Sequence, residues 1–586
     1  MKTIFQLVFI FFFGTVCSQK SLDITVKDKN SKEPLPYCNI VVEGSTKGTM
    51  TNINGEARIS ADPEKDVVVF SYLGYQPQKV RASELVKSGT VYLVPKDMIL
   101  KEVTVRPDND YLYDFVVKCR KKLMSNQTVN TSKAYYGLEV HSGAFPIEML
   151  ECYYNAAFNG VDLSSLNFRN GRVGHSSVDE NYFISLNTSK AIVEMKLTSD
   201  NGYFPANPLH LGKNKMKELF EMEVKSFYDS VYVITFTPKN KSGDCFSGDI
   251  WLETKSFNLL KINLNIENAS IHPFLPFLNS DTLKEISMSI SNNYTMHKKT
   301  MVPDYINFNY SFVYKSIRDS LTVLKPKISV REISTKVLMY FYEYDSTFIL
   351  PYFEYDNNFS DYKKISLIPF NEDFWNNNSA VLLNTDQKKM VEYFVKNGKL
   401  YNYYDKNYGY DFRVNSNQAH FEYSMSFWSA DKRIVLHKEN ENNKPYTKEE
   451  INRHIPSDLY NIKVQILLDV TKVGDSLLCK TYTVFDGFKT YYHFPEDEFT
   501  KVFLNLFFDI CEIERRKLEK ELTGKNLSLK EIESKYKSAL ENMDKVTSLY
   551  LKEVQMGKNP KGLKKWNLYV KEQLSIDNLK MFGVEQ

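Results

Sequence analysis

Length, aromatic content and a change in the spacing of apolar residues predict a multidomain, mainly β protein with an α-helical C-terminus. The chain has 586 residues, which is longer than a single domain with one hydrophobic core usually is. Its 39 Tyr and 39 Phe favour strands, whereas about the last hundred residues repeat apolar side chains at helical spacing. We expect a β-sandwich at 19–106, a linker helix at 107–130, a β-rich domain at 131–345, a mixed aromatic- and Asn-rich region at 346–490 and a helical bundle at 491–586.

Residues 1–18 have the pattern of a secretion signal peptide. A positive start is followed by an apolar run and then by small residues, which predicts cleavage before Gln19. In the alternative, Cys17 is a lipidated N-terminus, although Val16 is large for the position before a lipidated cysteine. No later segment has the roughly 20 continuous apolar residues of a membrane helix. We therefore expect an exported protein, periplasmic or associated with the outer membrane, with peripheral membrane attachment left open.

Short alternating strands separated by turn residues begin at Ser21. The dipeptide Asn54-Gly55 predicts a hairpin between the strands at 49–51 and 57–59. A continuous apolar strand at 67–72 suits the core of a sandwich, and a last strand at 91–94 closes the unit. About seven short strands in this space are typical of a compact β-sandwich.

An ordered series of motifs runs through the same region. The motifs are Glu33-Pro34-Leu35-Pro36, Gly44-Ser45-Thr46-Lys47-Gly48-Thr49, Thr51-Asn52-Ile53-Asn54-Gly55-Glu56, Phe70-Ser71-Tyr72-Leu73-Gly74-Tyr75 and Leu100-Lys101-Glu102-Val103-Thr104-Val105. Together they resemble the carboxypeptidase-D regulatory-like domain (CarboxypepD_reg-like), which implies a non-catalytic sandwich of the immunoglobulin or transthyretin type. Cys38 departs from the family, which usually has a small residue there. Such domains are abundant in Bacteroidota, where they precede the plug and barrel of SusC-type TonB-dependent receptors or head envelope proteins.

We expect neither a receptor nor a zinc carboxypeptidase. The segment after Val105 is too short for a plug and a 22-stranded barrel, and the chain ends after a helical region rather than on a membrane strand. A zinc carboxypeptidase needs a His-x-x-Glu pair and a later His. His493 and Glu496 have that spacing, but no His follows them and Pro495 interrupts the motif.

The middle of the chain begins with one amphipathic helix and continues with strands. The apolar stripe of the helix consists of Leu112, Phe115, Val116, Cys119 and Leu123. Three later runs have the rhythm of a curved antiparallel sheet: Thr235-Phe236-Thr237-Pro238-Lys239, Gly248-Asp249-Ile250-Trp251-Leu252-Glu253 and Leu259-Leu260-Lys261-Ile262-Asn263-Leu264. They are similar to the half-barrel of LolA-like lipoprotein carriers. That resemblance implies a concave face able to hold an acyl chain. In the alternative, the aromatic side chains simply pack the sheet.

The mixed region is rich in Tyr, Asn and Asp, as in the run 401–405. This composition suits loops that bind glycans or proteins, but an AT-rich genome produces it as well. We expect a short helix at 386–395 and two strands at 460–468 and 477–484, with a turn at 472–475.

Three helices are predicted at the C-terminus. Apolar residues recur at helical spacing from Phe499 to Ile513, and Ser528 with Glu531 forms a capping box for the second helix. A third stripe includes Leu563 and Trp566. We expect an antiparallel bundle because the stripes are needed to cover one another, which weakens the alternative of a partner-binding coiled coil.

Charge, cysteines and motifs narrow the function classes. A net charge of +3 from 75 basic and 72 acidic residues argues against a nucleic-acid binder. Six scattered cysteines follow Cys17: Cys38, Cys119, Cys152, Cys245, Cys479 and Cys511. Without a C-x-x-C pair they predict buried apolar side chains for the most part, with one or two disulfides left open. There is no phosphate-binding loop, nucleophile elbow or His cluster. We assign no catalytic, cofactor-binding or metal-binding residue, and no cofactor.

These observations favour a non-enzymatic, exported cell-envelope protein that acts by binding. The partner would be another envelope protein, and a lipid or glycan ligand remains open. One alternative is a periplasmic lipid or lipoprotein carrier, which requires an apolar groove on the concave face of the half-barrel. The other is a hydrolase without a recognisable motif, which requires carboxylates or a metal cluster converging in one pocket. A binding protein instead predicts a filled core.

Overall fold

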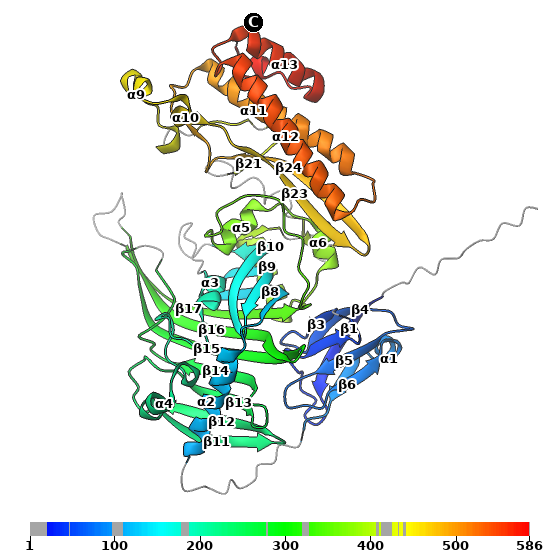
Figure 1. Cartoon of the computed structure of the whole chain (residues 1–586), viewed down its shortest axis with the longest axis vertical. Coiled ribbons are helices and arrows are strands. Elements are labelled where there is room, and N and C mark those ends of the chain that lie inside the picture. The colour runs from blue at the N-terminus through cyan, green and yellow to red at the C-terminus, as the bar shows by residue number, and fades with distance from the viewer. Residues whose placement is uncertain are drawn as a thin grey trace, which may run out of the picture.

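The computed structural model describes most of the chain after the predicted signal peptide. The described residues are 20–45, 47–96, 109–176, 187–276, 279–318, 327–402, 404–405, 410–411, 425–431, 433–436 and 441–584. The signal peptide at 1–18, with Cys17, and the motif at 100–105 lie outside the described residues. Figure 1 shows a small sandwich beside a large sheet, with the C-terminal helices at the far end of the sheet.

The N-terminal sandwich has two sheets, in the strand orders β4-β1-β7 and β3-β2-β5-β6. Its elements are β1 (Lys20–Asp28), β2 (Asn39–Val42), β3 (Gly48–Met50), β4 (Glu56–Ala61), β5 (Val67–Ser71), β6 (Gln78–Arg81), α1 (Ala82–Ser88) and β7 (Thr90–Leu93). Side chains such as Val26, Ile40 and Phe70 alternate inward from the two sheets into one core. The predicted β-sandwich is therefore confirmed.

The hairpin predicted around Asn54-Gly55 is wrong. Gly55 does turn the chain, with φ at +73°. However, β3 pairs with β2 and β4 pairs with β1, so the turn carries the chain from one sheet to the other. A Cβ atom on Gly55 would lie 2.6 Å from the carbonyl oxygen of Val26, which explains the need for glycine. The dipeptide indicates a left-handed turn, but it does not determine whether the flanking strands pair.

The middle of the chain forms one antiparallel sheet in the order β11-β12-β13-β14-β15-β16-β17-β8-β9-β10-β18. Its strands are β8 (Val129–Ser142), β9 (Phe145–Asn159), β10 (Asp162–His175), β11 (Phe220–Tyr228), β12 (Val231–Pro238), β13 (Ser247–Glu253), β14 (Leu259–Ile266), β15 (Thr282–His297), β16 (Thr300–Arg318), β17 (Lys327–Tyr342) and β18 (Lys399–Tyr401). We call this sheet the half-barrel, because Figure 1 shows it twisting around a helix that lies on one face.

That helix is α2 (Asp110–Ser125), the element predicted as a linker over 107–130. The side chains of Leu112, Val116 and Cys119 are fully buried. The hydroxyl of Tyr113 donates a hydrogen bond to the carbonyl oxygen of Phe220 at the start of β11, at 2.9 Å. The helix therefore does more than connect two parts of the chain: it supplies the core of the half-barrel. We call the face that it covers the inner face.

A Val116→Thr substitution is expected to cost about 1–3 kcal/mol of stability, because it buries a hydroxyl in apolar surroundings. Val86→Thr is the matched control, since Val86 is also helical but is 50% exposed. Thermal unfolding of both variants measures the difference. Equal midpoints would contradict the placement of α2 in the core.

The remaining chain forms short elements and then the helical bundle. The elements are α3 (Thr188–Glu194), η1 (Pro208–His210), α4 (Lys213–Leu219), α5 (Asp361–Leu367), α6 (Glu372–Asn377), α7 (Thr385–Asn397), β19 (Tyr404–Asp405), β20 (Tyr410–Asp411), β21 (Met425–Phe427), η2 (Glu441–Asn443), α9 (Lys448–Arg453), α10 (Pro456–Leu459), β22 (Tyr460–Asn461), β23 (Val464–Val473), β24 (Ser476–Asp486), β25 (Tyr491–Tyr492), α11 (Glu498–Leu522), α12 (Leu529–Val554), α13 (Pro560–Leu574) and α14 (Asn578–Met581).

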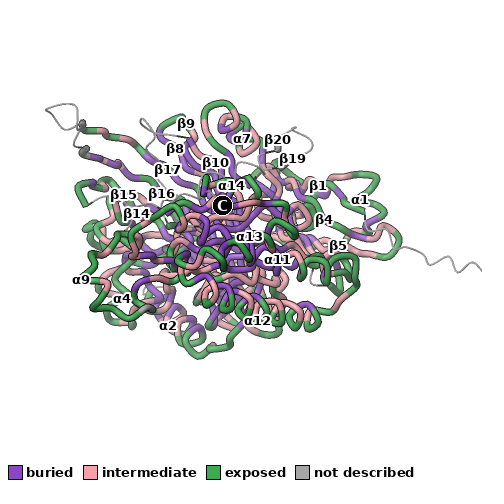
Figure 2. Tube along the Cα trace, turned by 90° about the horizontal axis from the view of Figure 1, so that it is seen from above, coloured by how far each residue is buried: buried purple, intermediate pink, exposed green. Residues whose placement is uncertain are grey.

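Helices α11, α12 and α13 pack on one another, as the spacing predicts. The capping box also forms: Ser528 accepts from the N–H of Glu531, whose carboxylate accepts from the N–H of Ser528 at 2.8 Å. The hairpin β23–β24 shares a core with these helices. Seen from above, buried residues occupy the centre of the molecule and exposed residues its rim (Figure 2).

Candidate binding surfaces on the half-barrel and the sandwich

The inner face of the half-barrel is filled by the protein's own side chains. Alternate residues of β16 that point to this face are almost completely buried, namely Ile306, Phe308, Tyr310, Phe312 and Tyr314. They pack in one cluster with α2 and with apolar residues of the segments between strands, namely Phe204, Leu209, Met216 and Phe274. Among the described residues, the protein's own side chains therefore occupy this part of the inner face.

The sandwich is attached to the half-barrel through β3. Val381, in the extended segment before α7, forms a parallel bridge with Met50. The N–H of Met50 and the hydroxyl of Thr49 both donate to the carbonyl oxygen of Ala380, at 3.3 and 2.9 Å. A segment of the chain thus adds itself to the free edge of a sandwich sheet.

Aromatic rings form the base of this attachment. The cluster consists of Tyr135, Tyr153, Tyr305, Tyr340, Tyr342 and Phe374, with Met50, Ala380 and Val381. From the sandwich, the ring of Tyr37 lies 5.4 Å from that of Tyr305, measured between centroids. The hydroxyl of Tyr153 donates to the carbonyl oxygen of Asn378 at 3.1 Å. Because aromatic rings contribute strongly to interfaces, this contact holds the sandwich in a fixed place.

One carboxyl group lies at the edge of the attachment. Oδ1 of Asp304, at the start of β16, accepts from Nδ2 of Asn39 in the sandwich at 3.3 Å. Burial raises the pKa of Asp304 to about 7. The protonated form is therefore the favoured one at mildly acidic pH, which makes the attachment sensitive to pH.

An Asp304→Asn variant is expected to lose this pH dependence. A carboxyl group whose pKa is raised by folding stabilises the fold below its ordinary value of 3.8, and this contribution disappears as the pH rises through about 7. The thermal midpoint of the natural protein should therefore fall relative to that of Asp304→Asn across this interval. Thermal scans at several pH values test this, with the exposed Asp475→Asn as control. A pH-independent difference between the two proteins would contradict it.

A small polar pocket lies between the sandwich and the half-barrel. Its volume is about 180 Å³, and its walls include Asn52, Glu139, Lys336 and Asn384. Nε2 of Gln387 donates to Oε1 of Glu139 at 2.8 Å, and burial raises the pKa of this glutamate. Pockets for small ligands usually measure about 300–1,000 Å³. This pocket is too small for a ligand of that class.

A larger hollow lies on the sandwich itself, between β6 and β7. Its volume is about 690 Å³, within the usual range for ligand sites. It is lined by Lys29, Gln76, Pro77, Gln78, Lys79, Val80, Glu84, Lys87, Ser88, Thr90, Val91, Tyr92 and Val94. We call it the β6–β7 groove. In Figure 1, β3 faces the large sheet whereas α1, next to the groove, lies on the opposite side of the sandwich.

The described residues contain no group of three or more His, Cys, Asp or Glu that could hold a metal ion. The ring of His493, from the rejected His-x-x-Glu pair, stacks on Tyr446 with centroids 4.1 Å apart, and its Nδ1 lies 2.9 Å from the carbonyl oxygen of Lys444. None of the described helices is both long enough and apolar enough to cross a membrane.

All six described cysteines are free thiols. Cys38, Cys119, Cys152 and Cys511 are buried, and burial raises the pKa of each, that of Cys119 to about 12. They serve as small apolar side chains, as the spacing predicts for most of them. The disulfides left open by the sequence do not form in this structure.

The sequence assigned no site residues, and the β6–β7 groove was missed. Its lysines are spread over a turn, a strand and a helix, so no local motif links them. The groove exists because β6 and β7 belong to different sheets, which the strand pattern alone does not reveal.

Comparison with known proteins identifies the sandwich. Residues 25–105 match the model of the CarboxypepD_reg-like domain, which confirms the resemblance seen in the sequence. Over 82 residues the chain is 40% identical to the TonB-dependent receptor SusC of Bacteroides thetaiotaomicron. This alignment covers 14% of the chain and 8% of the length of SusC.

Solved structures give only distant likenesses. A LolA superfamily protein of Nitrosomonas europaea aligns at 12% identity over 38% of this chain and 92% of that one, with a TM-score of 0.16. The MucA/MucB complex structure from Pseudomonas aeruginosa aligns at 9% identity over 39% and 94%, with a TM-score of 0.13. Scores of this size support no conclusion, so the half-barrel is described from its own strands.

Proposed function

We propose that the protein is a non-enzymatic, exported cell-envelope protein that acts by binding a protein partner. The observation that supports this most directly is the filled inner face of the half-barrel. Leu112, Val116 and Cys119 of α2 are fully buried there, together with the alternating side chains of β16. Because the protein's own side chains pack closely on this face, a partner would bind on the outer surfaces of the scaffold.

The same observation disfavours a lipid or lipoprotein carrier. A carrier needs an apolar cavity large enough for an acyl chain, and emptying this face would cost the burial energy of the side chains that fill it.

The attachment of the sandwich through β3 also fixes the position of the groove on its opposite side. We infer that the half-barrel and the sandwich work as one rigid body.

A location in the cell envelope fits two observations. The residues at 1–18 have the pattern of a secretion signal, and the sandwich is 40% identical over 82 residues to part of a TonB-dependent receptor. We propose that the mature chain starts at Gln19 and is periplasmic or attached to the outer membrane.

The test is native mass spectrometry of the protein purified from its own envelope after mild cross-linking. We expect a mass that corresponds to this chain plus a protein partner, without lipid, and an intact N-terminus at Gln19. A stoichiometric acyl lipid would instead support the carrier. A bare chain in both cross-linked and untreated samples would contradict binding as the mode of action.

A further inference from the structure

The β6–β7 groove is bordered by two strand edges that have no strand partner among the described residues. At one end the edges converge, where Tyr75 and Pro95 form an antiparallel bridge. At the other end α1 connects β6 to β7. Between these limits, β6 and β7 each have four residues.

On β7, alternate backbone groups point into the groove. β7 runs parallel to β1, and Gly89 and Leu93 accept hydrogen bonds from the N–H groups of Thr25 and Lys29. Because backbone groups alternate along a strand, the odd-numbered residues face β1. The N–H and C=O groups of Thr90 and Tyr92 therefore face away from β1, toward the groove.

The same reasoning applies to β6. The N–H of Glu43, just beyond β2, donates to the carbonyl oxygen of Val67, so odd-numbered residues of β5 face β2 and its even-numbered residues face β6. Val68 and Phe70 are paired with Val80 and Gln78. Lys79 lies between Gln78 and Val80, so its N–H and C=O are directed away from β5.

The charge around the groove is mainly positive. Its walls carry Lys29, Lys79 and Lys87 against a single acidic residue, Glu84. Lys79 is paired with Glu43, whereas Lys29 and Lys87 form no ion pair with any described residue. The exposed ring of Tyr92 lies beside the groove, with Nζ of Lys32 4.6 Å from its centroid.

The sandwich already binds an extended segment at another edge. At β3, residues 380–381 add to the sheet through a backbone hydrogen bond and a parallel bridge. That edge belongs to the same sheet as β6, at its opposite end. An extended chain is thus an occupant that this fold accepts, and positive walls select an acidic one.

We propose that the β6–β7 groove binds an extended, acidic segment of the protein partner, which adds as a strand to β7. This inference deepens the proposed function and rests on it. The N–H groups of Thr90 and Tyr92 donate to the backbone of the segment, and Lys29 and Lys87 contact its carboxylates. Such β-strand addition takes its affinity from the backbone and its selectivity from the side chains.

The test uses the full chain and a capped fluorescent peptide of alternating Glu and Val. Fluorescence anisotropy should show binding of this peptide, and weaker binding of a peptide of alternating Lys and Val. A version of the acidic peptide that is N-methylated at alternate residues keeps the charge but loses backbone donors, and it should bind at least about tenfold more weakly. Equal binding of the methylated and unmethylated acidic peptides would overturn strand addition, because charge alone would then explain the affinity.

Charge reversal tests the lysines. The double variant Lys29→Glu/Lys87→Glu should bind the acidic peptide about tenfold more weakly, since two attractive contacts become repulsive. The control is Lys121→Glu/Lys545→Glu, which makes the same charge change at exposed lysines of α2 and α12. Equal affinities of the two double variants would overturn the proposal.

Amide hydrogen exchange resolved to single residues tests the register. On binding, exchange should slow at Thr90 and Tyr92 but stay unchanged at Val91 and Leu93, which are already paired with β1. Absence of protection at Thr90 and Tyr92 would overturn the proposal. If these tests failed while native mass spectrometry showed a cross-linked partner, the groove would be rejected as the binding site and the proposed function would still stand.

Discussion

An Asp469→Ala substitution is expected to destabilise the protein by about 3–5 kcal/mol, because it leaves a buried arginine without its counter-charge. Asp469 on β23 accepts from Nη2 of Arg169 on β10 at 2.7 Å, and both side chains are at most 3% exposed. Nδ2 of Asn371 donates to the second carboxylate oxygen at 2.7 Å. The guanidinium also lies over the ring of Phe374, 4.6 Å from its centroid.

This ion pair joins the half-barrel to the C-terminal part of the protein. Removing Asp469 leaves the charge of Arg169 unpaired in a site that water does not reach, whereas removing an exposed carboxylate costs little stability. Asp475→Ala is the matched control, since Asp475 lies in the exposed turn of the same hairpin. Urea unfolding followed by circular dichroism measures both variants. A difference below about 1 kcal/mol between them would mean that the pair is not buried as described.

The double variant Arg169→Met/Asp469→Leu distinguishes the contribution of the two charges to stability from that of side-chain packing at the same place. Replacing both charged residues by apolar side chains of similar volume leaves no unpaired charge. The double variant should therefore be less destabilised than Asp469→Ala. A double variant that is equally unstable would show that the hydrogen bonds to Asn371 and Thr471, rather than the charges, hold this junction.

What the sequence predicted correctly is local. The capping box at Ser528 and Glu531 involves residues three positions apart, and the alternation in the sandwich reflects neighbours along one strand. The prediction over 386–395 is likewise confirmed by α7. In each case the interaction that causes the pattern joins residues only a few positions apart in the sequence.

What the sequence could not predict depends on partners far along the chain. Arg169 and Asp469 are 300 residues apart, and neither has a distinctive neighbourhood. The stripe on α2 correctly predicted a buried face, but nothing in it indicated that a sheet assembled from strands between residues 129 and 401 would cover that face. The hairpin at Asn54-Gly55 failed for the same reason: strand pairing is decided by the other strands of both sheets.

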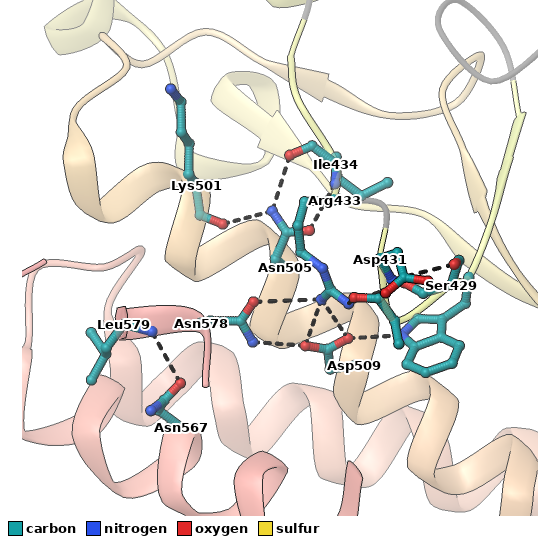
Figure 3. A network of polar contacts seen from close by, with 12 residues as sticks. Ser429, Asp431, Arg433, Ile434, Lys501, Asn505, Asp509, Asn567, Asn578 and Leu579 are labelled. Atoms are coloured by element: carbon teal, nitrogen blue, oxygen red, sulfur yellow. Dashed lines mark hydrogen bonds and ion pairs between the residues drawn. The ribbon is translucent and has the colours of Figure 1, made fainter. Parts of the chain in front are cut away.

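A second buried acid, Asp509 on α11, organises the C-terminal part (Figure 3). Its carboxylate accepts from Nη1 of Arg433 at 2.9 Å, from Nε1 of Trp428 at 2.7 Å and from Nδ2 of Asn578 at 2.7 Å. The guanidinium of Arg433 also donates to the carbonyl oxygen of Ser429 at 3.1 Å. One carboxylate thereby ties residues 428–431, residues 433–434 and the start of α14 to the bundle.

An Asp509→Ala substitution is therefore expected to cost about 3–5 kcal/mol, because it leaves the guanidinium of Arg433 buried and three donors without their acceptor. The segment around 428–434 should also become accessible to protease, since its main anchor to α11 is lost. Thermal unfolding and limited proteolysis measure the two effects. Asp431→Ala is the control, because Asp431 is an exposed carboxylate in the same segment. If both variants were cleaved at the same rate, the segment would be held by its apolar contacts and not by Asp509; if only Asp509→Ala were cleaved rapidly, the network in Figure 3 would be the anchor.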